Sequence, residues 1–164
     1  MIHVALVHPE IAVNVADAGR TCVVAGARLH IVKPIGFVLG NIFERPGMSG
    51  YWNKGEPVIH ESLDAFLAIL PTLGEPRLLS THGKKSFYEV PLPEDIVLIF
   101  GNERYGLPDS LRSSHSQHVV SLPGSPHVVS LTLPTAVGVA VYETLRRHNS
   151  PDNGATVAHA KWRL

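Results

Sequence analysis

Residues 96–108 have the sequence IVLIFGNERYGLP, which contains the strongest structural signal in the chain. Five apolar residues, 96–100, form a short run rich in β-branched and aromatic side chains, and such a run is typical of a strand buried on both faces. The run ends at Gly101 and is followed by three polar residues, 102–104. Because open α/β sheets bind ligands beyond the carboxyl ends of their strands, we expect this loop to form the centre of a functional site.

The same loop also has a purely structural explanation, which stays open at this point. Gly101 and Gly106 provide turn geometry, and Pro108 is suited to the first position of the next helix. The loop is not a phosphate-binding loop of the G-x-x-x-x-G-K-[ST] type, because Gly106 is followed by Leu107 and Pro108. A dinucleotide site is also disfavoured, since no G-x-G-x-x-G is present in the chain.

Length and composition favour one globular domain. The chain has 164 residues, of which 45% are hydrophobic and 17% charged, so it can bury a substantial core.

The formal net charge of zero argues against a protein surface that is basic all over, as in general nucleic-acid-binding proteins, although it permits a local basic patch. Cys22 is the single cysteine, which suits a reducing compartment. We find no signal segment and no apolar run of about 18 residues, so we expect a cytoplasmic protein with no membrane partner.

Predicted strands and helices alternate along the chain. We expect strands at residues 1–7, 29–32, 58–60, 77–81, 96–100 and 118–122. We expect helices at residues 11–26, 62–70 (closed by Pro71), 107–113 and from 132 onward. Residues 35–57, which contain five glycines, are expected to form a loop with at most a short helix. The alternation predicts an α/β fold with a mostly parallel sheet covered by helices on both faces. We assign residues 1–150 to this domain and residues 151–164 to a C-terminal tail.

Three motifs follow one another along the chain. The first is PEIAVNVADAGRTC (residues 9–22), with GARLHIVKPIGF (residues 26–37) behind it, the second is FGNERYGLP (100–108), and the third is LPGSPHVVSLTLPTAVGVAVYE (122–143). Together they resemble the SPOUT class of RNA methyltransferases, and within it the TrmH-like 2′-O-ribose methylases. The similarity is strongest to the short TrmL type, which methylates the wobble ribose of tRNA. It covers about nine tenths of the chain.

The resemblance implies roles for individual residues. Arg20 matches the arginine that acts on the ribose 2′-hydroxyl, Asn14 stands beside it in the same motif, and Glu103 matches the glutamate of the second motif, so all three are expected to be catalytic. The positions that hold S-adenosylmethionine are matched by Leu79, Gly101, Leu122 and Ser130, and Leu131 adds an apolar side chain for the adenine. The resemblance also implies a C-terminal trefoil knot, a homodimer with sites at the subunit interface, tRNA as partner, and no metal.

The residues themselves permit simpler explanations for most of these positions. The leucines are typical core residues, Arg20 is spaced for an i,i+3 pair with Asp17, and Glu103 and Ser130 suit a turn and a loop. The candidate cations for RNA phosphates are Arg20, Arg28, Arg45, Lys84, Lys85 and Arg104, ahead of Arg146 and Arg147. The pair Lys84-Lys85 is also typical of a solvated turn.

The third motif departs from the family pattern Ser-x-Asn-x-Ser. Thr132 replaces an amide with a hydroxyl, and Pro134 removes a hydroxyl and a backbone donor. Tyr105 also stands where TrmL-type proteins often carry Arg.

From the resemblance we expect S-adenosylmethionine-dependent 2′-O-methylation of tRNA position 34, cytidine or uridine. The alternatives are methylation of another tRNA or rRNA position, or a non-catalytic RNA-binding dimer with a degenerate third motif.

Overall fold

The computed structural model describes residues 1–42, 48–125, 127 and 130–148. Within these ranges the strands are β1 (Ile2–Val7), β2 (Arg28–Val32), β3 (Val58–His60), β4 (Glu75–Leu79), β5 (Lys85–Ser86), β6 (Ile96–Phe100) and β7 (Val119–Ser121). The α-helices are α1 (Ala12–Ala25), α2 (Met48–Gly55), α3 (Leu63–Leu73), α4 (Asp109–Ser114) and α5 (Leu133–His148), with short 3-10 turns η1 (Leu39–Ile42) and η2 (Ser116–His118). The predicted tail, residues 151–164, lies outside the described residues.

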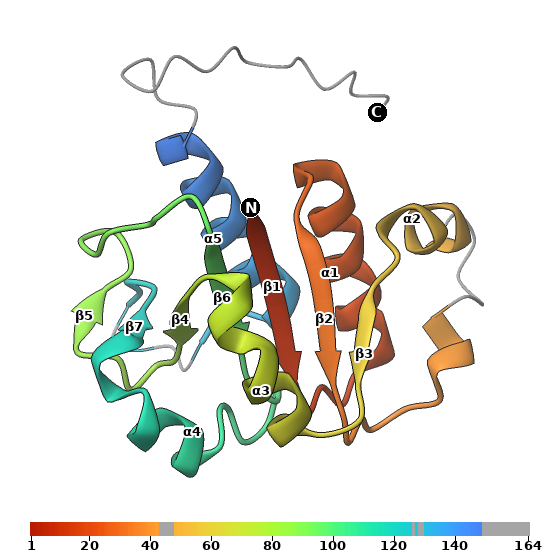
Figure 1. Cartoon of the computed structure of the whole chain (residues 1–164), viewed down its shortest axis with the longest axis horizontal. Coiled ribbons are helices and arrows are strands. Elements are labelled where there is room, and N and C mark those ends of the chain that lie inside the picture. Colours follow the sequence, from red (N-terminus) through yellow and green to blue (C-terminus); the bar gives the residue numbers. More distant parts are fainter. Residues whose placement is uncertain (43–47, 126, 128–129, 149–164) are drawn as a thin grey trace.

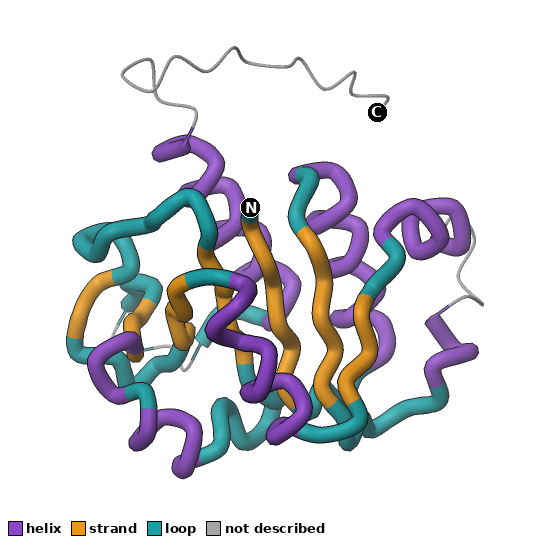
Figure 2. Tube along the Cα trace, in the orientation of Figure 1, coloured by secondary structure: helices purple, strands orange, loops and turns teal. Residues whose placement is uncertain are grey.

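The strands form one sheet in the order β3-β2-β1-β6-β4-β7-β5 (Figures 1 and 2). Every pair of neighbouring strands is parallel. The predicted parallel α/β sheet is therefore confirmed, and the carboxyl ends of its strands lie along one edge.

Strand β6 is the middle strand of the sheet. All five of its residues are buried, and their side chains alternate between the two faces. Leu98 packs in a core that includes α1 and α5 residues such as Ala16 and Val137. Ile99 packs on the opposite face, in a core that includes Phe66 of α3 and Leu111 of α4. Helices cover both faces of the sheet, as expected, and Figure 1 shows α3 and α4 on the face opposite α1 and α5.

Several boundaries differ from the sequence-based prediction. Helix α3 does not stop at Pro71 but continues to Leu73, since a proline in the last turn removes only one intrahelical donor. Helix α4 begins at Asp109, with Pro108 as its N-cap rather than its first helical residue. Strand β5, only two residues long, was not predicted because so short a run has no periodicity.

The outer half of the sheet has an unusual connection. Strand β7 lies between β4 and β5, although it comes after both in sequence. The chain lies close to β7 on both sides of β5: the Ser80 amide, just after β4, donates to the Val120 carbonyl at 2.9 Å, and the Phe87 amide, just after β5, donates to the Ser121 carbonyl at 2.8 Å. At Gly83 a Cβ atom would lie 2.3 Å from the carbonyl carbon of Val120, so only glycine fits at this position.

Candidate active site

Two loops meet at the carboxyl edge where the neighbouring strands β1 and β6 end. The Asn102 side-chain amide donates to the His8 carbonyl at 2.8 Å, which joins the β6 loop to the β1 loop. Asn102 also shapes its own loop, because its side-chain oxygen accepts from the amides of Arg104 and Tyr105 at 2.8 and 3.0 Å. The loop closes through paired backbone hydrogen bonds between Asn102 and Gly106, whose φ of 71° favours glycine.

Gly101 has a steric role in this loop. A Cβ atom at Gly101 would lie 2.2 Å from the carbonyl carbon of Gly106 and from the amide nitrogen of Leu107. The turn-geometry explanation for both glycines is therefore supported by the structure. It is compatible with a ligand role, since a site formed by backbone atoms needs the chain to fold back closely.

Glu103 binds the start of α1. Its Oε2 accepts from the Glu10 amide at 2.8 Å, and its Oε1 accepts from the Ile11 amide at 3.3 Å and from the Asn14 side-chain amide at 3.1 Å. The N-cap residue Ile11 provides no side-chain cap of its own. A carboxylate at a helix N-terminus satisfies unpaired amides and interacts favourably with the helix dipole. The structure thus brings Asn14 and Glu103 together, and it gives Glu103 a capping role that no local sequence signal reveals.

His8, which follows β1, has an unusual backbone conformation. Its φ is 54°, in the left-handed region, and such a conformation costs about 1 kcal/mol or more in a residue with a Cβ atom. The half-buried imidazole has a lowered pKa, chiefly because burial disfavours its charged form. Strained residues cluster at functional sites, and the His8 carbonyl is the group that the Asn102 side chain contacts.

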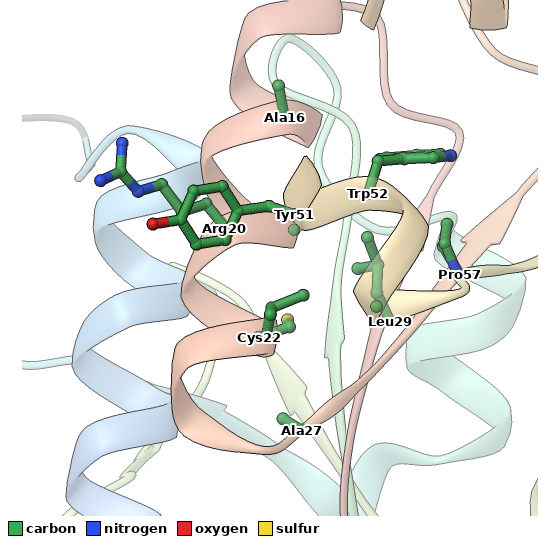
Figure 3. A pocket seen from close by; sticks show the side chains of 11 residues that line it. Ala16, Arg20, Cys22, Ala27, Leu29, Tyr51, Trp52 and Pro57 are labelled. Carbon is green, nitrogen blue, oxygen red and sulfur yellow. The ribbon is translucent and has the colours of Figure 1, made fainter. Parts of the chain in front are cut away.

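Arg20 lies apart from the Asn14–Glu103 pair. Six residues of α-helix separate it from Asn14, which corresponds to about 9 Å along the axis and about 240° of rotation. The exposed Arg20 guanidinium instead lies over the ring of Tyr51 in α2, with 4.8 Å between its carbon and the ring centroid. Figure 3 shows the two side chains together beside a narrow pocket between α1 and α2. Tyr51 was not predicted because it lies in the segment expected to be a loop.

The pocket beside Arg20 is lined mainly by apolar groups, among them Gly19, Leu29 and Trp52. Cys22 also lines it, and burial raises the pKa of its thiol to about 12. A thiol with so high a pKa is a poor nucleophile near neutral pH.

Three of the predicted cofactor residues lie at the carboxyl ends of adjacent strands. The order β6-β4-β7 and the strand register place Leu79 between Phe100 and Val120. Gly101 and Leu122 come one and two residues after those partners, so Leu79, Gly101 and Leu122 belong to the same edge. Leu79 is buried, while Gly101 and Leu122 are half-buried. This arrangement offers both apolar side chains and backbone amides at the ends of the strands.

The other two cofactor candidates, Ser130 and Leu131, are exposed, and only Thr132 separates them from α5. The residues that depart from the family pattern have roles at the beginning of this helix. The Thr132 hydroxyl is 2.7 Å from the Thr135 hydroxyl, and the Thr132 carbonyl accepts from the Ala136 amide. Pro134 is the second helical residue, where a missing N–H leaves no intrahelical bond unmade.

The described residues contain no group of three or more His, Cys, Asp or Glu side chains arranged to hold a metal ion. Among the same residues, no helix has the length and apolar character needed to cross a membrane. The positively charged candidates are spread over the molecule: Arg28 begins β2, at the opposite edge of the sheet, where it pairs with Glu56 at 3.9 Å. Arg45 lies outside the described residues.

Fold and site together define a parallel α/β protein in which two polar loops are joined at the carboxyl edge and a later strand is inserted between two earlier ones. The chain belongs to the SpoU rRNA Methylase family, whose model matches residues 1–142. This confirms the family to which the three motifs pointed.

Similar proteins cover nearly the whole chain. A tRNA (cytidine(34)-2'-O)-methyltransferase from Methylovorus glucosotrophus is 34% identical over 152 residues, 91% of this chain and 97% of the relative. A protein of the same name from Burkholderia ambifaria is 34% identical over 149 residues, 90% of this chain and 96% of the relative. A solved structure described by the words "Structural insights into the 2-OH methylation of C/U34 on tRNA" matches with a TM-score of 0.79 and 35% identity, covering 90% of both chains.

Proposed function

We propose that this protein transfers the methyl group of S-adenosylmethionine to the ribose 2′-hydroxyl of nucleotide 34, cytidine or uridine, in a tRNA. The observation that carries the proposal is that the first two motif loops are hydrogen-bonded to each other where β1 and β6 end, and that the third motif begins after β7 at the same edge of the sheet. The names of the relatives, which match this chain over nine tenths of its length, support the same reaction and the same nucleotide.

The residues fit the cofactor in chemical type. Leu79, Leu122 and Leu131 offer apolar surface for an adenine, and the amides after β6 and β7 offer hydrogen bonds to its edges. When bound, S-adenosylmethionine supplies a methyl group on a sulfonium, which is transferred by in-line displacement. The protein has to hold the ribose oxygen close to that carbon and in line with the leaving sulfur.

Arg20 is assigned to the ribose rather than to proton removal. An arginine is always protonated near neutral pH, so it cannot act as a general base, but it can donate hydrogen bonds to the 2′-oxygen or to an adjacent phosphate. The preferred role is positioning, in which Arg20 acts together with a phosphate of the RNA. Glu103 and Asn14 are positioning residues, because they hold the amino end of α1, the helix that carries Arg20.

The domain bounds, the knot, the homodimer and the cytoplasmic location are part of the same proposal. We assign the methyltransferase domain to residues 1–150, a knot to the region where β7 passes between β4 and β5, and the working state to a cytoplasmic homodimer. The strand order and the close approach of Gly83 to Val120 support the knot. A dimer is supported by the separation of Arg20 from the Asn14–Glu103 pair, since a second subunit can bring a complementary part of the site next to Arg20.

The test is to incubate the purified protein with S-adenosylmethionine and unmodified total tRNA, and to identify 2′-O-methyl nucleosides by mass spectrometry after digestion. We expect 2′-O-methylcytidine or 2′-O-methyluridine, which fragment analysis maps to position 34. Methylation elsewhere in tRNA or in rRNA would replace the assigned nucleotide. Absence of both product and cofactor binding would favour a non-catalytic RNA-binding dimer.

A further inference from the structure

We propose that the groove between α4 and the segment joining β4 to β5 binds the phosphate backbone of the tRNA substrate outside the reacting nucleotide. Its lining includes Lys84, Lys85, Asp109, Arg112, Ser113 and Gln117. Its volume of about 540 Å³ is within the range of nucleotide-sized ligand sites rather than single-ion sites. The proposal rests on the proposed function, because it names where that substrate is held.

Both walls of the groove are continuous with the candidate active site. One wall, residues 82–85, follows Leu79 at the end of β4. The other wall, in α4, follows the loop that contains Gly101 and Glu103. An RNA strand lying in the groove therefore extends from the same edge of the sheet at which the methyl group would be transferred.

The charges in the groove suit a polyanion. Lys84, Lys85 and Arg112 contribute three positive charges, and Asp109 is the one acidic group in the lining. Both lysines are exposed, and no ion pair involving either is found among the described residues. Asp109 is paired with Arg112, so it does not neutralise the lysines directly. Because the whole chain has zero net charge, this local excess of positive charge makes the groove a selective site for phosphate.

Hydrogen-bond donors accompany these charges. Ser113, Ser116 and Gln117 are exposed in the lining, and hydroxyl and amide groups are common partners of phosphate oxygens. Arg112 donates from Nη2 to Asp109, while its buried Nε has no acceptor among the described residues. A buried donor without a partner is rare in folded proteins, and a nearby phosphate is one acceptor that a modest shift of this side chain would reach.

The backbone that carries the lysines is held firmly. The Gly83 amide donates to the Ser80 carbonyl at 3.0 Å, and the Ser80 amide donates to the Val120 carbonyl of β7 at 2.9 Å. The close approach of Gly83 to Val120 leaves no room for this turn to slide. Because the backbone is fixed in advance, binding a phosphate orders only the side chains and costs less conformational entropy.

The experiment compares the Lys84→Ala/Lys85→Ala double variant with wild type and with a Lys33→Ala/Lys54→Ala control. The control removes the same charge from the other half of the molecule, where Lys33 follows β2 and Lys54 lies in α2. Affinity for unmodified tRNA is measured at several salt concentrations, together with S-adenosylmethionine affinity and the kcat and KM for methylation. We expect the groove variant to bind tRNA about tenfold more weakly, with a salt slope reduced by roughly 1.4 to 1.8. Its KM for tRNA should rise while cofactor affinity and kcat stay near wild type.

Unchanged tRNA affinity and salt slope in the groove variant would overturn the proposal, and so would an equal loss in the control, because that would show a general charge effect. The wild-type measurement separates this failure from that of the proposed function. A wild-type protein that methylates tRNA while the groove variant binds normally contradicts only the groove. A wild-type protein that binds no tRNA contradicts both proposals.

Discussion

At the scale of single residues, Arg20 has the most direct role in the proposed reaction. We expect Arg20→Ala to reduce methyl transfer by about a hundredfold or more, because the ribose oxygen would lose its charged hydrogen-bond donor. Affinity for S-adenosylmethionine should stay within about twofold of wild type, as measured by calorimetry, since Arg20 lies on α1 and is not one of the residues assigned to the cofactor. Loss of cofactor binding together with activity would contradict the role assigned to Arg20.

Tyr51 is the residue that fixes the Arg20 guanidinium. A cation above an aromatic ring gains about 0.5 to 2 kcal/mol, so we expect Tyr51→Leu to lower kcat by roughly three- to thirtyfold with an unchanged KM for S-adenosylmethionine. Tyr51→Phe is the matched control, because it keeps the ring and removes only the hydroxyl. Equal losses in the two variants would mean that the hydroxyl, and not the ring face, is what matters.

At the scale of elements, the Glu103 carboxylate joins the β6 loop to the amino end of α1. Glu103→Ala leaves two backbone amides and the Asn14 side chain without their acceptor, and we expect the free energy of unfolding to fall by about 1 to 3 kcal/mol. Urea denaturation measures this change. Glu89→Ala, which removes an exposed carboxylate elsewhere, should change the midpoint very little. An unaltered midpoint in Glu103→Ala, accompanied by lost activity, would instead indicate a direct contact with substrate.

The elements also show what a sequence can and cannot reveal. The apolar run of β6 and the helix over residues 11–26 were predicted from local pattern, and the structure has β6 at Ile96–Phe100 and α1 at Ala12–Ala25. The hydrogen bond between Asn14 and Glu103 joins residues 89 positions apart, so neither residue carries a local sign of it. Tyr51 and the position of β7 were missed for the same reason: pairing between distant segments is decided by tertiary packing, which no periodicity reports.

At the scale of the whole molecule, three histidines connect the strands of one half of the sheet. His3 Nδ1 is 2.9 Å from His30 Nε2, and His30 Nδ1 is 2.9 Å from His60 Nε2, so the rings link β1, β2 and β3. Burial, followed by the neighbouring histidines, lowers the pKa of His30 to about 3. The pKa values of His3 and His60 are lowered as well, chiefly by burial.

These lowered pKa values predict a fold that weakens in acid. The unfolded chain binds a proton at His30 near its ordinary pKa of 6.5, whereas the folded chain does so only near pH 3, so stability is lost as pH falls from about 6.5 toward 3. We expect about 2 kcal/mol less stability from His30 alone at pH 4.5 than at pH 7. Urea unfolding at the two pH values checks this. His30→Leu should flatten the dependence, whereas His127→Leu, at an exposed position, should not.

The insertion of β7 has a consequence for biosynthesis. A ribosome makes β4 and β5 more than thirty residues before β7, so the outer half of the sheet has a gap until residues 119–121 have emerged. Leu79 and Leu122, which flank the assigned cofactor surface, come together only after that gap is closed. A nascent or truncated chain that ends before β7 therefore cannot present this surface, and the ability to bind the cofactor marks a chain whose synthesis has passed its last strand.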